Sequence, residues 1–102
     1  MPGFIFVAKR SEIPEGSGLC VEVEGKRIAL FRLGKAVCAI DDACPHANGP
    51  LSEGSLEGAV VECPWHGSRF NVSTGEVTRR PAARGVATYV VRVTGEEVEV
   101  EL

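Results

Sequence analysis

Two short segments of the sequence each contain one thiol and one imidazole. They read Cys-Pro-His at 44–46 and Cys-Pro-Trp-His at 63–66, with sixteen residues between His46 and Cys63. Together they hold both histidines of the protein and two of its four cysteines. Thiolate and imidazole bind soft and borderline metal ions well. The pattern therefore predicts two loops that close on a common metal centre.

A single zinc ion held by two cysteines and two histidines is one interpretation of these residues. Structural zinc sites usually space their thiols as C-x₂₋₄-C and their imidazoles as H-x₃₋₅-H. This chain mixes the two ligand types instead, as C-x-H followed by C-x₂-H. The mixed order disfavours zinc.

The two segments resemble the cluster-binding loops of the Rieske [2Fe–2S] family, in which one iron has two cysteine ligands and the other has two histidine ligands. The His-Gly-Ser sequence at 66–68 is similar to the family's second loop, and the Gly-Pro-Leu sequence at 49–51 is similar to part of the first loop of its soluble ferredoxins. The resemblance implies one [2Fe–2S] cluster per chain. The implied ligands are Cys44 and Cys63 on the inner iron and His46 and His66 on the outer iron.

The sequence departs from the Rieske proteins of respiratory and photosynthetic cytochrome complexes. Those proteins have two further cysteines, which form a disulfide between the cluster loops, and a tyrosine that donates to a ligand sulfur. This chain has Gly49, Trp65 and Phe70 at those positions. It retains Ser68, which the resemblance makes a donor to a cluster sulfur, and such hydrogen bonds raise the potential. We expect a midpoint potential in the lower half of the Rieske range of about −150 to +300 mV.

Further residues are expected to surround the cluster. By resemblance, Pro81 belongs to a third loop that covers it. Trp65 is expected to pack over the cluster and exclude water from that end. The complete set expected around the ligands is Trp65, Gly67, Ser68, Phe70 and Pro81.

The implied ligand set favours electron transfer. Two ferric ions, two sulfides and two thiolates sum to a formal charge of about zero, and neutral imidazoles add none. A cluster with four cysteine ligands is more negative, so an electron enters the histidine-ligated cluster more easily. The chemistry implied is one-electron transfer with no bond made to a substrate.

Length, charge and hydropathy exclude several classes of protein. We expect the chain of 102 residues to form one domain over 1–102. The net charge of −3 argues against non-specific nucleic-acid binding. No apolar run approaches the roughly 18 residues that span a bilayer. The first ten residues have no basic residue ahead of their apolar run, so they do not form a secretory signal, and we expect a soluble protein in the cytoplasm.

The alternation of apolar and polar residues predicts an all-β fold of short strands separated by glycine-rich turns. We expect a small antiparallel β barrel or sandwich, as in the Rieske fold, with a loop-built cluster-binding subdomain at one end and cluster-binding loops over about 42–85. Residues 41–58 and 79–85 are expected to be loops. The expected strands are 4–8, 19–24, 27–33, 36–40, 59–62, 69–72, 88–94 and 97–102.

The remaining cysteines and the arginines near the motifs have less specific interpretations. We expect Cys20 to be an exposed thiol, because it shares a strand phase with Glu22 and Glu24, and Cys38 to point inward, because it shares a phase with Ile40. A second metal site made from these two cysteines alone lacks ligands. The arginines are interpreted either as solvated surface charge or as a docking rim for a redox partner. They are Arg69, Arg79, Arg80 and Arg84.

Three functions fit the sequence. The first, implied by the resemblance, is a Rieske-type ferredoxin that passes electrons from a flavin-dependent reductase to a terminal oxygenase and is monomeric when free. The second is a small electron-transfer subunit of another oxidoreductase, such as a nitrite reductase, and the third is a zinc-stabilised structural module. A catalytic oxygenase subunit is excluded, because its non-haem iron needs two more histidines and a carboxylate, and the chain has two histidines in all. We therefore expect an electron-transfer protein and not an enzyme.

Overall fold

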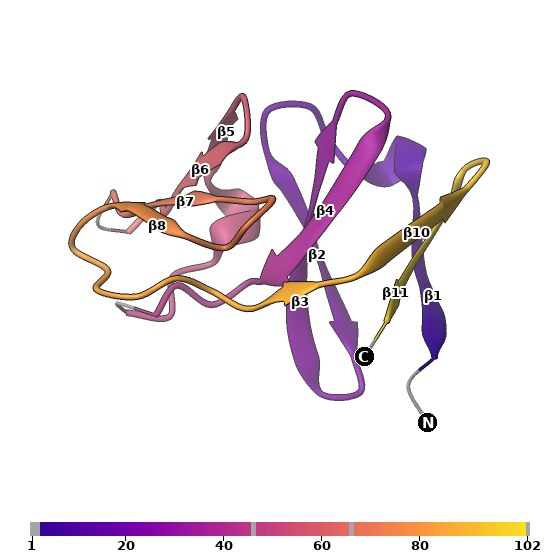
Figure 1. The fold of residues 1–102 in the computed structure, drawn as a ribbon, viewed down its shortest axis with the longest axis horizontal. Helices are drawn as coiled ribbons and strands as arrows, with labels where there is room; N and C mark the ends of the chain where they lie inside the picture. Colours follow the sequence, from indigo (N-terminus) through magenta and orange to yellow (C-terminus); the bar gives the residue numbers. More distant parts are fainter. Residues whose placement is uncertain (1–2, 46, 66, 102) are drawn as a thin grey trace.

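The computed structural model describes residues 3–45, 47–65 and 67–101, whose strands form three antiparallel sheets (Figure 1). Two of the sheets, β1-β11-β10 and β2-β3-β4-β9, build one end of the molecule, which we call the base. The third sheet, β5-β6-β7-β8, lies within the lobe, residues 42–86, at the other end. The base contains β1 (Phe4–Lys9), η1 (Arg10–Glu12), β2 (Gly18–Val23), β3 (Lys26–Leu33), β4 (Ala36–Asp41), β9 (Thr88–Tyr89), β10 (Val91–Thr94) and β11 (Glu97–Glu101). The lobe contains η2 (Leu51–Glu53), β5 (Ser55–Glu57), β6 (Val60–Glu62), β7 (Arg69–Asn71) and β8 (Val77–Arg79).

The strands of the base follow the alternation that the sequence predicts. The β2-β3-β4 meander turns at Gly25 and Gly34, both of which have positive φ, a conformation that favours glycine. On β11, Val98 and Val100 are fully buried, while the glutamates that alternate with them are not. The all-β prediction and the first meander are confirmed. Leu102, predicted to end the last strand, lies outside the described residues.

The predicted strand at 88–94 is wrong as a single element. β9 pairs with β4 in one sheet, whereas β10 pairs with β11 in the other, so the chain changes sheets between them (Figure 1). Val90 lies at the change and is 59% exposed. A segment that reads as one strand in the sequence therefore forms two short strands in different sheets.

The two predicted loops contain regular structure. The segment 41–58 includes η2 and β5, and the segment 79–85 begins at the end of β8. Each strand of the lobe is three residues long, which is too short to show a period of two in the sequence. Gly54 leads into β5, where an added Cβ would lie 2.0 Å from the carbonyl oxygen of Glu62. Only glycine permits that approach of β5 to β6.

Strand β3 joins the base to the lobe because both of its faces are buried. Ile28 and Leu30 belong to the core of the base, together with Val98 and Val100. The alternate residues of β3 belong to a second core within the lobe. That core consists of Ala29, Phe31, Ile40, Cys44, Leu51, Val61, Cys63, Phe70, Val72 and Ala82. In the described part of the chain, no helix has the length and apolar character needed to cross a membrane.

Candidate metal centre

The first ligand segment is a closed loop that leaves the end of β4. Ala43 and Pro50 form an isolated antiparallel bridge at its base. The backbone N–H of Cys44 donates to the carbonyl of Gly49 at 2.9 Å, and the N–H of Asn48 donates to the carbonyl of Cys44 at 2.7 Å. Asn48 has φ +60°, a left-handed conformation that asparagine tolerates better than most residues. Cys44 is therefore held at the buried start of a tight turn.

The second ligand segment repeats this closure. The N–H of Cys63 donates to the carbonyl of Ser68 at 2.7 Å, and the N–H of Gly67 donates to the carbonyl of Cys63 at 3.1 Å. Gly67 has φ +79° and stands at the same place in its loop as Asn48 does in the first. In both loops the cysteine accepts from the residue four positions later and donates to the residue five positions later. This correspondence follows from backbone geometry and is not visible in the residue spacing.

The two loops lie against each other, which brings their thiols into one core. Cys44 and Cys63 are both almost fully buried in the core of the lobe. A Cβ added to Gly49 would lie 2.7 Å from Sγ of Cys63, so the backbone of the first loop comes close to the thiol of the second. His46 and His66, the other predicted ligands, lie outside the described residues. Two thiols that paired loops bury in one core fit the sulfur ligands of an iron–sulfur centre.

A third loop closes over the core. Ala82 is buried in the same core as both cysteines, and its N–H donates to Oγ of Ser68 at 2.9 Å. Ser68 is itself fully buried. Because Oγ accepts in this bond, the hydroxyl proton is free to donate elsewhere. Pro81 is exposed, so the residue of this loop that enters the core is Ala82.

Comparison with known families identifies the centre that these loops hold. Residues 3–90 match the family model described as the Rieske [2Fe-2S] domain. The chain belongs to the Rieske [2Fe–2S] family. It therefore has one [2Fe–2S] cluster per chain, and the alternative of a structural zinc ion does not apply.

Several Rieske proteins that are similar to this chain are ferredoxins. The ferredoxin component of the naphthalene 1,2-dioxygenase system of Pseudomonas aeruginosa is 42% identical over 91 residues, which are 89% of this chain and 88% of that protein. The ferredoxin of carbazole 1,9a-dioxygenase from Nocardioides aromaticivorans has a TM-score of 0.89 at 33% identity, and the match covers 95% of both chains. A chain in a complex of reduced oxygenase and oxidized ferredoxin in carbazole 1,9a-dioxygenase has a TM-score of 0.87 at 36% identity, over 95% of this chain and 91% of that one. This Rieske protein is accordingly an electron carrier within an oxidoreductase system and not itself an enzyme.

Trp65 lies where the two loops meet. An added Cβ on Gly49 would lie 3.1 Å from the indole ring and 2.7 Å from Sγ of Cys63, so the ring rests on the first loop close to that thiol. Trp65 is 56% exposed, so part of its surface faces solvent. That Trp65 packs over the cluster stays a prediction. Phe70 is fully buried in the core with Cys63.

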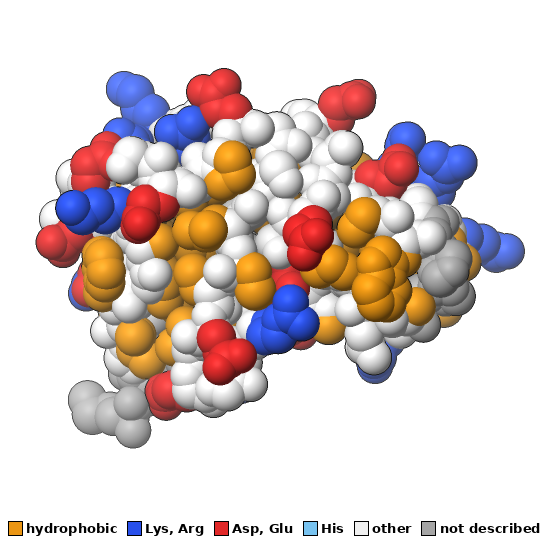
Figure 2. Space-filling model, turned by 180° about the vertical axis from the view of Figure 1, so that it is seen from behind, with side chains coloured by type: hydrophobic (Ala, Val, Ile, Leu, Met, Phe, Trp, Pro, Cys, Tyr) orange, Lys and Arg blue, Asp and Glu red, His pale blue; other side chains and the backbone are white. Residues whose placement is uncertain are grey.

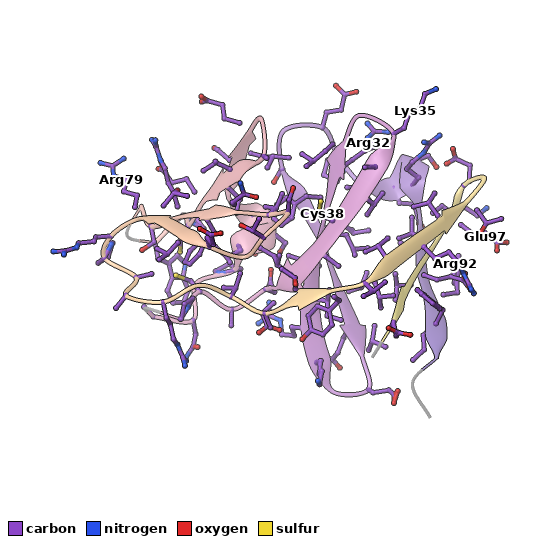
Figure 3. All side chains as sticks on the ribbon, viewed as in Figure 1. Arg32, Lys35, Cys38, Arg79, Arg92 and Glu97 are labelled. Carbon is purple, nitrogen blue, oxygen red and sulfur yellow. The ribbon has the colours of Figure 1, made fainter. Side chains whose placement is uncertain are left out.

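The arginines of the lobe divide into one paired and three unpaired side chains. Arg69 on β7 pairs with Glu62 on β6, with Nε and Oε1 separated by 2.9 Å. In the described ranges, Arg79, Arg80 and Arg84 form no ion pair, and all three are exposed. Arg79 extends away from the ribbon at the lobe end of the molecule (Figure 3). Of the four arginines singled out in the sequence, Arg69 is therefore the one with an ion-pair partner among the described residues.

The remaining thiols take no part in the centre. Cys20 is exposed on β2, as predicted. Cys38 is only half-buried, and its Sγ lies 3.8 Å from Oγ of Ser73. Among the described residues, no group of three or more His, Cys, Asp or Glu side chains is placed to hold a metal ion. A second metal site built on Cys20 and Cys38 is thus not found in that part of the chain.

Sequence reasoning missed one charged residue beside the first loop. Asp42 is fully buried and forms an ion pair with Arg27 at 3.0 Å. Hydrogen bonding to Cys20 and the charge of Asp42 raise the pKa of Arg27. In the sequence Asp42 looks like one of two adjacent loop acids, and only its burial distinguishes it from Asp41.

Proposed function

We propose that this protein is the free ferredoxin of a ring-hydroxylating dioxygenase system, which carries single electrons from a flavin-dependent reductase to a terminal oxygenase. Residues 1–102 form one Rieske domain in this proposal. The observation that carries it is the matched closure of two loops that bury one thiol each in the same core, in a chain related to dioxygenase ferredoxins. We assign Cys44 and Cys63 to the inner iron and His46 and His66 to the outer iron, as the resemblance of the two segments to the Rieske loops implies.

The bound cluster accepts and releases one electron without forming a bond to substrate. The protein supplies the environment in which this happens. Leu51 and Phe70 are fully buried beside the two cysteines and keep water from the sulfur-ligated side. Ser68 is oriented by Ala82 and has a proton to donate toward a cluster sulfur. Both features act on the potential, through solvent exposure and through hydrogen bonding to sulfur.

The exposed side chains of the second and third loops form the docking surface in this proposal, with Trp65 at its centre and Arg79, Arg80 and Arg84 at its rim. Tryptophan and arginine are the residues that most often dominate binding energy at protein interfaces. Figure 2 shows basic side chains standing out at the lobe end, beside exposed hydrophobic ones. A partner that presents an apolar patch with carboxylates around it complements this surface.

The experiment that tests the function uses the purified protein, a flavin-dependent reductase and a ring-hydroxylating oxygenase. We expect a coloured protein containing iron and acid-labile sulfide that is reduced by the reductase and reoxidised by the oxygenase. Material that stays colourless after anaerobic reconstitution would refute the proposal. A nitrite reductase that reoxidises the protein, while the oxygenase does not, would favour the second function named above.

The docking surface is tested by the salt dependence of electron transfer. Arg79→Gln and Arg80→Gln should each slow the second-order rate to the partner about 2- to 10-fold at low ionic strength, and high salt should remove the difference. Arg92→Gln is the matched control, because Arg92 lies on the base and pairs with Glu99 there. Equal effects of the lobe and base substitutions would contradict the assignment.

We also expect the protein to be monomeric and cytoplasmic, which gel filtration and cell fractionation can check.

A further inference from the structure

Asp42 is a buried charged residue that is not one of the proposed ligands of the cluster. It is the second residue before Cys44, and its side chain is 1% exposed. Aspartate is almost never fully buried unless it is paired. The contacts of Asp42 therefore indicate what the carboxylate does.

Asp42 connects β3 to both ends of the first ligand loop. Its Oδ1 accepts from the N–H of Ser52 at 2.8 Å, and its carbonyl accepts from the N–H of Leu51 at 2.7 Å. Its own N–H donates to the carbonyl of Arg27 at 3.1 Å. Its Oδ2 lies 3.0 Å from Nη2 of Arg27. The residue thus fixes the point at which the chain enters the loop that begins at Cys44.

The ion pair is unequal in its exposure to water. The carboxylate is buried, whereas the Arg27 side chain is 58% exposed. Water screens a surface cation far more than it screens a buried anion. Moreover, Oδ2 of Asp42 receives no hydrogen bond from the described residues, although Arg27 lies within ion-pair distance. Part of the negative charge of Asp42 is therefore left uncompensated beside the first ligand loop.

We propose that Asp42 and Arg27 together set the potential of the metal centre as well as the position of the loop. The inference rests on the proposed ligand set. Reduction adds one electron from the donor protein, with no proton or bond transferred, so its cost depends on nearby fixed charge. The Asp42 carboxylate opposes reduction, and the Arg27 guanidinium offsets part of that effect. Asp42 is a positioning and charge-setting residue and is not a ligand.

The test compares Asp42→Asn, Arg27→Gln and the double variant by redox titration of the cluster-loaded protein. Asp42→Asn keeps an acceptor for Ser52 and removes the charge, so the midpoint should rise. Arg27→Gln should lower it, and the double variant should lie between the two single variants. Arg92→Gln, which breaks an ion pair on the base, is the control and should shift the midpoint least.

A residue with a purely structural role would give a different result. Midpoints of Asp42→Asn and Arg27→Gln that shift in the same direction, or by no more than that of Arg92→Gln, would overturn the proposal. If Asp42→Asn fails to retain the cluster, Arg27→Gln and Arg27→Glu decide the question, since Arg27 is exposed and its variants should fold. Arg27→Glu should then lower the midpoint more than Arg27→Gln, and a smaller or opposite shift contradicts the inference. A wild-type protein that binds no cluster would instead refute the proposed function.

Discussion

The base and the lobe are held together in different ways. Strands β2, β3 and β4 of the base have six to eight residues and bury a continuous apolar core. The strands of the lobe have three residues each, and the core of the lobe includes Cys44 and Cys63 themselves. The base is therefore stabilised mainly by side-chain packing, whereas we expect the stability of the lobe to depend on the metal centre as well. We therefore expect the base to act as the stable scaffold and the lobe to be the region in which electron transfer takes place.

The largest expected effect comes from removing a ligand of the lobe. Cys63→Ser should abolish the visible absorbance, because the buried inner iron loses a thiolate. Loss of the cluster should also loosen the lobe and leave the base folded, so hydrogen exchange should accelerate at β6 and β7 but not at β3. The control is Cys20→Ser, since Cys20 is exposed on the base and should be dispensable. Uniform acceleration across both regions would contradict the proposed independence of the base.

A cavity in the base should lower the stability of the protein and leave the redox centre unchanged. Leu30 is fully buried in the core of the base, and Leu30→Ala should lower the free energy of unfolding by about 2–5 kcal/mol. The midpoint potential should not change, because the substitution is on the face of β3 that points away from the lobe. Urea unfolding and redox titration measure the two quantities. A clear change in the midpoint potential of Leu30→Ala would show that the base and the lobe are coupled through β3.

A third prediction concerns the contact between the two ligand loops. Gly49→Ala should reduce cluster incorporation, because the new Cβ would lie 2.7 Å from Sγ of Cys63 and 3.1 Å from the Trp65 ring. Displacing a packed loop in this way typically costs about 1–3 kcal/mol. Iron content per chain after reconstitution is the measurement. Gly3→Ala is the control, since an added Cβ there meets nothing within 4 Å. Full incorporation in Gly49→Ala would contradict the close apposition of the loops.

The base was largely predictable from the sequence, and the lobe was predictable mainly through its ligand segments. Long alternating strands such as Lys26–Leu33 carry a periodic signal, but the three-residue strands Ser55–Glu57 and Val77–Arg79 do not. The two segments indicated a metal centre because each combines a cysteine with a histidine two or three residues later, and packing alone gives no reason for that repeated pairing. The burial of Asp42 was not predictable, since it depends on Arg27 from a strand that precedes it by fifteen residues. The 56% exposure of Trp65 was not predictable, because hydropathy does not reveal which apolar residues remain at the surface.

A fourth prediction tests how the lobe adjusts its potential. Ser68→Ala removes the hydroxyl that Ala82 orients, and the midpoint should fall. A hydrogen bond that is about 1 kcal/mol stronger in the reduced state corresponds to about 40 mV for one electron. Ser73→Ala is a matched control, because Ser73 lies in a turn of the lobe beside Cys38. An unchanged midpoint in Ser68→Ala would remove Ser68 from the set of residues that act on the cluster.

The smallest effect is expected at the junction between the two regions. Tyr89 on β9 donates to Oδ1 of Asp41, the last residue of β4 before the lobe, at 2.5 Å. Burial, followed by the hydrogen bond and charge of Asp41, raises the pKa of Tyr89 to about 12 from 10.0. The folded protein then holds this proton more tightly than the unfolded chain does. The stability that depends on it is complete below pH 10 and is lost as the pH rises toward 12.

Tyr89→Phe removes this titration and keeps the ring. Because Tyr89 is the only tyrosine of the protein, no other phenol contributes to the difference between the variant and the wild type. The loss of urea resistance at alkaline pH should be less steep in the variant, and lysine titration affects both proteins alike. Parallel profiles would mean that the hydrogen bond to Asp41 does not contribute to stability at the junction. In that case the packing of β3 and the contacts of Asp42 with Arg27 would be what joins the lobe to the base.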